Sequence, residues 1–264
     1  MRNTYSMVYG FYKQDPNFIY DKQTRKVMAR VLKKDSNCLD VGANEGMFVR
    51  EMLKFAPEGE HMAFEPIPEL AAKVEARYPQ VEVHNCALSD VSGWSTFQLV
   101  TNNPGYSGLR RRHYEFGEPI IKEITVRTRT LDELYPLERP LRFVKIDVEG
   151  AEYLVLRGGM RTLERHRPYI VFEHGRGAAT FYDVRPEQLY DLLRKELDME
   201  ISVMADWLED GAPLTRDEFI DQFVNNINYY FLAHPRGLAE RPSGPELLPD
   251  TQHAHRGQHV LDLQ

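Results

Sequence analysis

Short apolar runs and segments of helical periodicity follow one another along this chain of 264 residues. The apolar runs predict buried strands, and the segments in which apolar side chains recur every three or four residues predict helices. The predicted strands span 37–42, 61–65, 81–84, 141–146, 169–172, 200–204 and 228–233. The predicted helices span 22–32, 45–55, 69–78, 150–165 and 186–197. This alternation predicts βαβ units and an α/β fold with a mostly parallel sheet.

The middle of the chain departs from this rhythm. Residues 94–100 and 123–128 alternate like half-exposed strands, and the polar stretch 101–120 lies between them. We interpret residues 93–128 as an insert in one parent domain, since such excursions commonly carry substrate-specific loops. The predicted organisation is an N-terminal helical and aromatic segment (1–36) packing on the core, a main domain (37–234) and a flexible tail (235–264).

Composition narrows the class of protein. The formal net charge of −7 argues against a nucleic-acid partner, which would need a phosphate-neutralising surface. No apolar run reaches the roughly 20 residues of a membrane span, and the first residues lack the apolar core of a signal peptide. The two cysteines, Cys38 and Cys86, lie in strand-like contexts that favour reduced, buried thiols. We therefore expect a cytoplasmic protein; its oligomeric state is left open, with a homodimer as one option.

A glycine turn after the first predicted strand is the leading candidate for a cofactor site. The run from Cys38 to Phe48 passes from an apolar strand into a helix through Gly42, Ala43 and Gly46. A turn with little side-chain bulk lets backbone N–H groups approach a ligand at the start of a helix. NAD would require a third glycine, in the order Gly-x-Gly-x-x-Gly. The spacing from Asp40 to Gly46 instead resembles the first motif of class I methyltransferases.

Two further strand ends extend this predicted cofactor site. Glu65 ends the second strand, where an acid would bind the ribose hydroxyls of either cofactor. Ala87, Leu88 and Ser89 follow the third strand, where an adenine ring would be recognised, although a simple polar turn explains Ser89 equally well.

A group of acids ends the strand at 141–146. Asp147, Glu149 and Glu152 follow it within six residues, and Lys145 precedes them. Buried unpaired charge is costly, so such a group implies a role. It could bind a cation, orient a substrate hydroxyl or neutralise a sulfonium; a salt-bridged structural cluster is the alternative.

These motifs together resemble one family. Leu-Asp-Val-Gly-Ala-Asn-Glu-Gly, Phe-Glu-Pro and Val-Lys-Ile-Asp-Val-Glu-Gly-Ala-Glu-Tyr, followed by Val-Leu-Arg-Gly-Gly, resemble the FkbM family of S-adenosylmethionine-dependent methyltransferases. The similarity covers residues 9–234. It implies a three-layer class I methyltransferase (Rossmann-like) fold, with a seven-stranded mixed sheet whose last strand is antiparallel. Members mostly O-methylate hydroxyls of sugars, macrolides and other natural products.

The resemblance implies S-adenosylmethionine as cofactor and a small hydroxylated acceptor, a sugar, glycan or natural product, as substrate. Asp147 would lie at the methyl-transfer face and also contact the cofactor. The expected cofactor-binding residues are Asp40, Gly42, Ala43, Asn44, Gly46, Glu65, Pro66, Ala87, Leu88, Ser89 and Asp147.

A hydroxyl acceptor needs help in losing its proton. Histidine is the natural base near neutral pH, and His174 follows the strand at 169–172. We predict His174 as general base, with Glu173 or Asp147 orienting it. A divalent metal bound by Asp147, Glu173 and His174 is conceivable, but we do not predict one.

The insert offers candidate acceptor contacts. Glu149 and the insert residues Asn102, Asn103, Tyr106 and Ser107 are expected to contact a hydroxylated ligand. The basic run 110–112 could meet a phosphate or carboxylate, although a solvated surface run is the commoner reading.

Three other functions remain open. They are N- or carboxyl-methylation on the same fold, an NAD-dependent oxidoreductase, and a non-catalytic cofactor-binding module.

Overall fold

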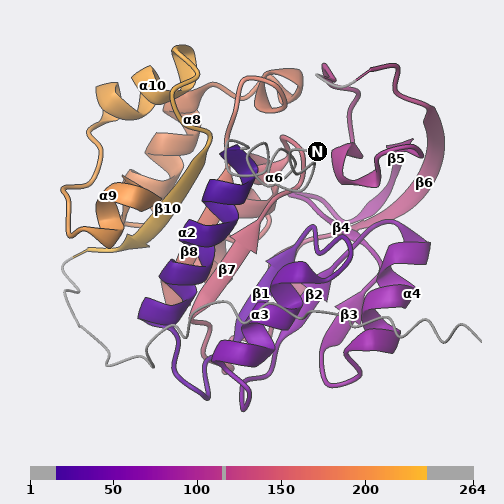
Figure 1. Cartoon of the computed structure of the whole chain (residues 1–264), viewed down its shortest axis with the longest axis horizontal. Coiled ribbons are helices and arrows are strands. Elements are labelled where there is room, and N and C mark those ends of the chain that lie inside the picture. Colours follow the sequence, from indigo (N-terminus) through magenta and orange to yellow (C-terminus); the bar gives the residue numbers. More distant parts are fainter. Residues whose placement is uncertain (1–15, 115–116, 237–264) are drawn as a thin grey trace, which may run out of the picture.

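A computed structural model describes residues 16–114 and 117–236 (Figure 1). Its centre is a seven-stranded sheet in the order β3-β2-β1-β7-β8-β10-β9. Its strands are β1 (Cys38–Val41), β2 (Met62–Phe64), β3 (Glu82–His84), β7 (Phe143–Ile146), β8 (Tyr169–Glu173), β9 (Met199–Val203) and β10 (Tyr230–Pro235). Strand β10 runs antiparallel to both β8 and β9, while the other pairs are parallel. The expected mixed sheet with an antiparallel last strand is confirmed.

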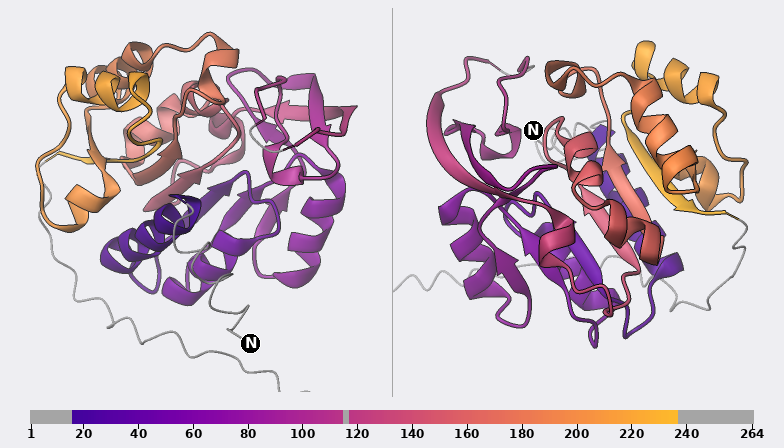
Figure 2. Two further views of the ribbon diagram at one scale, coloured as in Figure 1. Left: turned by 45° about the horizontal axis from the view of Figure 1, so that its top comes forward. Right: turned by 180° about the vertical axis from the view of Figure 1, so that it is seen from behind.

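Helices cover both faces of this sheet (Figures 1 and 2). One face packs against α2 (Pro16–Val31), α3 (Met47–Phe55), α4 (Pro68–Arg77) and α9 (Met204–Leu208). The other packs against α5 (Leu131–Leu134), α6 (Glu152–Arg157), α7 (Met160–His166), α8 (Pro186–Asp191) and α10 (Arg216–Val224). The central strands β1, β7 and β8 are buried on both faces, which explains why they read as nearly continuous apolar runs.

Polar residues interrupt two of these buried strands at neighbouring positions. Asp40 in β1 and Lys145 in β7 are register partners, so their side chains lie on the same face of the sheet. Both are buried. The two interruptions in the apolar pattern are therefore a single feature of the fold.

The prediction of a single helix over 150–165 is wrong. The structure has two short helices, α6 and α7, with Gly158 and Gly159 between them. A Cβ on Gly158 would lie 2.0 Å from the backbone oxygen of Ser89, so this position packs directly against another loop. The predicted helix at 186–197 is α8 continued by a π-helical turn (Leu192–Glu196). Helices α9 and α10 were not predicted.

The insert forms a second, smaller sheet. Strands β5 (Gly93–Val100) and β6 (Ile121–Arg129) pair antiparallel, and β4 (Ala87–Leu88) pairs with β6. Phe97 and Val126 point inward and pack on Ile67 and Leu70, which begin α4. A short 3-10 helix, η1 (Pro104–Tyr106), lies in the connection between β5 and β6. The insert is thereby held beside the carboxyl ends of β1 and β2.

The chain ends lie largely outside the described residues. Of the predicted N-terminal segment, the structure describes α2 and the turn after it, and α2 packs Val27 and Met28 into the core. Of the predicted tail, only residues 235 and 236 are described, so its character stays a prediction. Cys38 and Cys86 are free and buried. Among the described residues, no helix has both the length and the apolar character needed to cross a membrane.

Candidate active site

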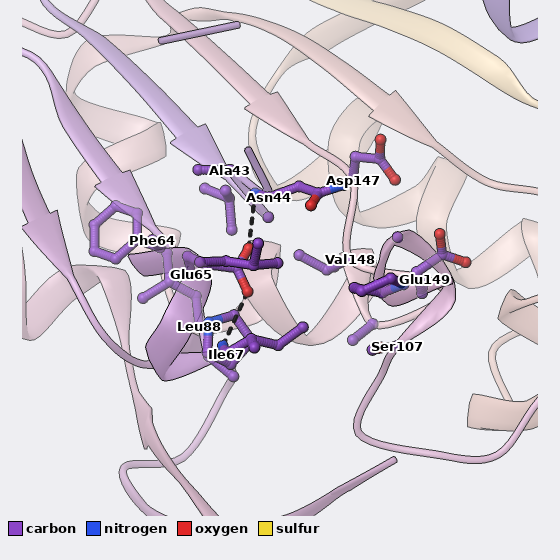
Figure 3. Close-up of a pocket in the computed structure, with 18 of the residues that line it drawn as sticks. Ala43, Asn44, Phe64, Glu65, Ile67, Leu88, Ser107, Asp147, Val148 and Glu149 are labelled. Carbon is purple, nitrogen blue, oxygen red and sulfur yellow. Dashed lines mark hydrogen bonds between the residues drawn. The ribbon is translucent and has the colours of Figure 1, made fainter. Parts of the chain in front are cut away.

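A cavity of about 460 Å³ lies at the carboxyl ends of β1, β2 and β7, between the main sheet and the insert (Figure 3). Many of the predicted site residues line it: Gly42, Ala43, Asn44, Glu65, Pro66, Ala87, Leu88, Asn103, Ser107, Asp147 and Glu149. Others do not line it: Asp40, Gly46, Ser89, Asn102, Tyr106, Glu173 and His174. The tertiary structure therefore brings the glycine turn, the second strand end and the acidic group to one cavity.

The glycine turn contains three residues with left-handed backbone: Gly42, Asn44 (φ +48°) and Gly46. Gly42 has φ +82°, and a Cβ there would lie 1.9 Å from the backbone oxygen of Asp147. Gly46 has φ +79°, and its Cβ would lie 2.9 Å from the Tyr78 ring. The Asp147 N–H donates to the Val41 carbonyl at 3.0 Å, so the ends of β1 and β7 are tied together. Bare backbone at Gly42 is what allows this close approach.

The N–H groups of this turn are mostly used within the protein. Gly42 and Ala43 both donate to the Phe64 carbonyl, and Gly46 donates to Ala43. The Asn44 N–H donates to Glu65 at 2.7 Å. These four amides therefore hold the turn in place, contrary to the sequence-based expectation that they approach a ligand.

Glu65 is fixed at the cavity wall by two backbone donors (Figure 3). One carboxylate oxygen accepts from Asn44 and the other accepts from the Ile67 N–H at 2.9 Å. Burial raises the pKa of Glu65 to about 7, and the two hydrogen bonds oppose this rise. Each oxygen keeps a second lone pair, so the carboxylate can still accept hydrogen bonds from a diol.

Asp40 lies beneath the turn, away from the cavity. Burial raises its pKa to about 6, and the Lys145 ammonium opposes that rise. Its Oδ1 atom has no hydrogen-bond partner among the described residues. Lys145 separates Asp40 from the cavity, since its Nζ atom lies 4.0 Å from Asp40 Oδ1 and the lysine itself lines the cavity.

Asp147 is the most densely contacted acid of the site. Its Oδ2 atom accepts from Lys145 Nζ at 3.0 Å and from the Tyr230 hydroxyl at 2.7 Å. Burial acts to raise the pKa of Asp147, but Lys145 and these hydrogen bonds outweigh burial and lower it. Burial likewise acts to lower the pKa of Lys145, but Asp147 and Asp40 outweigh it and raise it. Asp147 is thus a carboxylate beside an ammonium.

Glu173 complements Asp147. Its pKa is raised well above the ordinary value, first by burial and then by the negative charge of Asp147. Glu173 therefore holds its proton more tightly than an ordinary glutamic acid, and its carboxyl group is hydrogen-bonded to that of Asp147. Two adjacent carboxyl groups with pKa values displaced in opposite directions share one proton.

The oxygen atoms of Asp147, Glu149 and Glu173 lie within 4.8 Å of one another. This is not the predicted metal-ligand set, because Glu149 replaces His174. Two protein cations already face these acids: Lys145 contacts Asp147, and Arg112 forms an ion pair with Glu149. The described side chains thus neutralise the cluster without a metal ion.

The structure does not support His174 as the general base. Its ring stacks on Phe219 and Phe223 of α10, at centroid distances of 5.9 and 4.7 Å. Burial lowers the pKa of His174 to about 3, and its Nε2 atom has no hydrogen-bond partner among the described residues. Because the ring belongs to an apolar layer and does not line the cavity, we withdraw that role.

The arginines of the insert are engaged by the protein itself. Arg112 pairs with Glu149 and lies 5.2 Å above the Tyr106 ring. Arg110 contacts Asp183 at 2.9 Å. These contacts fasten the insert over the acidic end of the cavity, although Arg110 and Arg111 are both exposed and only Arg112 is half-buried. A substrate phosphate is therefore not needed to explain Arg110 or Arg112.

Two other insert residues have structural partners. The Asn102 side chain donates to the Glu118 carbonyl and accepts from the Ile120 N–H. The Ser107 hydroxyl accepts from the Val100 N–H, while the residue still lines the cavity.

Two features of the site, Tyr230 and the apolar wall, were missed, and the structural alternative given for Glu152 describes its contacts better than a functional one. Tyr230 contacts Asp147 from a strand 83 residues later, and no local signal marks it. The apolar wall formed by Ile67, Leu70, Phe97 and Leu109 reads in the sequence as ordinary core. Glu152 accepts hydrogen bonds from the N–H groups of Val148 and Gly150, which fixes the loop that carries Glu149.

Comparison with known proteins identifies the family. The methyltransferase FkbM domain matches residues 40–201, which is well over half of the chain. This chain belongs to that family. The sequence-based resemblance is confirmed, and the strand order agrees with the class I methyltransferase fold that it implied.

The individual proteins that this chain resembles share about a third or less of their aligned residues with it. The AMB antimetabolite synthetase AmbE of Pseudomonas aeruginosa is 32% identical over 81% of this chain, which spans only 12% of that protein. The 2-O-methyltransferase NoeI of Sinorhizobium fredii is 30% identical over 55% of this chain and 66% of its own length. The crystal structure of a methyltransferase FkbM from Methylobacillus flagellatus is 16% identical, with a TM-score of 0.46, over 77% of this chain and 45% of that one.

Proposed function

We propose that this protein transfers a methyl group from S-adenosylmethionine to a hydroxyl of a small molecule, a sugar or a related natural product. One observation carries the proposal: a single cavity is lined by the glycine turn, by Glu65 and by Asp147. These are the elements that a methyltransferase needs for a nucleoside and for a reacting hydroxyl. Family membership supports the same activity.

Different cavity residues fit the adenine, the ribose and the sulfonium of the cofactor. The apolar wall of Ile67, Leu88 and Phe97 suits an adenine ring. Glu65 has free lone pairs for the two ribose hydroxyls. The acidic end at Asp147 suits the positive sulfonium, and Gly42 and Ala43 line the cavity beside it. When bound, this cofactor supplies an electrophilic methyl group.

Asp147 is the residue that we assign to the acceptor. It faces the cavity as a carboxylate, so it can accept a hydrogen bond from the acceptor hydroxyl and direct an oxygen lone pair towards the methyl group. Formation of the new C–O bond would break the methyl–sulfur bond and release S-adenosylhomocysteine, and the hydroxyl proton, made acidic by that bond, would pass to Asp147. Lys145, Tyr230 and Glu173 lower the pKa of Asp147, which weakens it as a base, but they hold it in one orientation.

We expect that orienting the acceptor contributes more to the reaction rate than removing its proton does. Alignment of two reactants can supply about 7–11 kcal/mol, whereas general-base assistance supplies about 10²–10⁴-fold in rate. A carboxylate held by three donors fits the first role better than the second. Glu149, Asn103 and Ser107 lie on the same cavity wall and are proposed acceptor contacts.

The names of the relatives support a small-molecule acceptor. NoeI is described as a 2-O-methyltransferase and AmbE as an antimetabolite synthetase. O-methylation is therefore preferred over N- or carboxyl-methylation.

Binding and turnover test the proposal. S-adenosylhomocysteine should raise the melting temperature of the full chain, and NAD should not; stabilisation by NAD alone would establish the oxidoreductase alternative. With a panel of sugar and natural-product acceptors, mass spectrometry should detect one added methyl group.

Asp147→Asn tests the role of the acid. We expect turnover to fall by about 10²-fold, at the lower end of the general-base range, because the amide oxygen can still orient the hydroxyl but cannot take its proton, while S-adenosylhomocysteine still binds. The matched control is Asp217→Asn on the exposed side of α10. Equal turnover in both variants would remove Asp147 from the reaction.

A further inference from the structure

Acidic side chains outnumber basic ones on the cavity wall. Five acids line it: Asp21, Glu45, Glu65, Asp147 and Glu149. Among the described residues of its wall, Lys145 is the single basic side chain. The methionine part of S-adenosylmethionine carries a carboxylate as well as an ammonium, and a carboxylate in an acid-lined cavity needs a cation.

Four amides of the glycine turn do not meet this need. The N–H groups of Gly42, Ala43, Asn44 and Gly46 all donate to acceptors within the protein. Helix α3 begins directly after Gly46, and the Val49 N–H in its first turn donates to the Asp40 carboxyl group. The amides that hold the turn are therefore committed, and a carboxylate beside the start of α3 would still lie among five acidic side chains.

Lys145 has the geometry to receive the carboxylate. Its side chain is only 6% exposed and reaches the cavity between β7 and α3, with Nζ 5.0 Å from the Phe48 ring centroid. One donor is engaged by Asp147 at 3.0 Å, whereas Asp40 lies at 4.0 Å, beyond good hydrogen-bond distance. An ammonium group has three donors, so Lys145 retains donors for a ligand.

We propose that Lys145 is a positioning residue that binds the carboxylate of the methionine part of the cofactor. The inference rests on the proposed function, since it requires that this cofactor enter the cavity. One ammonium then bridges two carboxylates, that of the ligand and that of Asp147. The methyl donor and the residue that orients the acceptor are held through the same atom.

A ligand that lacks only the carboxylate isolates this contact. Calorimetry on the full chain would compare S-adenosylhomocysteine with its decarboxylated analogue, S-adenosyl-3-thiopropylamine, which keeps the ammonium. A charge-assisted hydrogen bond predicts that the wild-type protein prefers the carboxylate-bearing ligand by roughly 10- to 100-fold. Lys145→Met should abolish this preference, and Lys145→Arg should restore part of it. The surface control Lys122→Met should retain it, because Lys122 is exposed on β6.

A double variant keeps the test informative if Lys145→Met alone does not fold. Lys145→Met leaves two buried carboxyl groups without their cation, so Asp40→Asn/Lys145→Met is measured beside Asp40→Asn. Asp40→Asn should keep the preference and the double variant should lose it. An unchanged preference in the Lys145 variants would overturn the inference while leaving the proposed function intact. Failure of the wild-type protein to bind S-adenosylhomocysteine would instead refute both.

Discussion

Gly42→Ala offers the sharpest test of how the site is built. Gly42 has φ +82°, a conformation that L-residues other than glycine rarely adopt. An added Cβ would lie 1.9 Å from the backbone oxygen of Asp147 and 3.0 Å from its carbonyl carbon. These are backbone atoms and cannot rotate away. The ends of β1 and β7 would have to separate, which moves Asp147.

The expected loss of stability can be worked from these two effects. A left-handed conformation costs alanine about 1–2 kcal/mol, and forcing an extra carbon into a packed site costs about 1–3 kcal/mol. Together they predict a loss of about 2–5 kcal/mol in the free energy of unfolding. Because a native domain is stable by only about 5–15 kcal/mol, the effect should be plain in a denaturant titration.

The matched control is Gly93→Ala at the start of β5. A Cβ there would meet nothing closer than the Thr128 hydroxyl at 3.9 Å, and its φ is not positive. Urea unfolding followed by circular dichroism would compare the midpoints of both variants with wild type, and turnover would be measured below each transition. A Gly42→Ala protein as stable and as active as Gly93→Ala would refute the argument that close backbone contact positions Asp147.

Two further predictions concern single side chains. Burial raises the pKa of Glu65 to about 7 in the folded protein, above its unfolded value, so its contribution to stability is complete below about pH 4.5 and is lost as pH rises through 7. Glu65→Gln should therefore flatten the melting-temperature profile of the ligand-free protein between pH 5 and 8 relative to the exposed control Glu75→Gln, and identical slopes would contradict the assignment. His174→Phe should keep full turnover and at least wild-type stability, because the ring lies in an apolar stack with Phe219 and Phe223; a large loss of turnover with unchanged affinity for S-adenosylhomocysteine would return His174 to the reaction.

Much of the fold is legible in the sequence because it rests on local patterns. The apolar runs of β1, β7 and β8 are nearly continuous because those strands are buried on both faces, and such runs can be recognised in the sequence. Where a contact between residues distant in the sequence divides an element, the local pattern gave a wrong prediction. The periodicity of 150–165 is helical throughout, but Gly158 packs against the Ser89 backbone and the helix is divided there.

The residues on the cofactor side of the candidate site could likewise be predicted from the sequence. Gly42 and Glu65 follow strand ends, and parallel strands bring their carboxyl ends to one edge of the sheet. The sequence by itself therefore determined the family, the glycine turn and the acidic group at 147–152.

Only the tertiary structure decided what those groups do. It turned the His174 ring away into a phenylalanine stack, and it brought Tyr230 to Asp147 across 83 residues. It also placed Lys145 between Asp40 and Asp147, on the wall of a cavity whose other charged lining residues are acids. The physical reason is that ionisation and hydrogen bonding depend on which groups lie within a few ångströms of one another. Distances across strands are set by register and packing, which no local spacing in the sequence records.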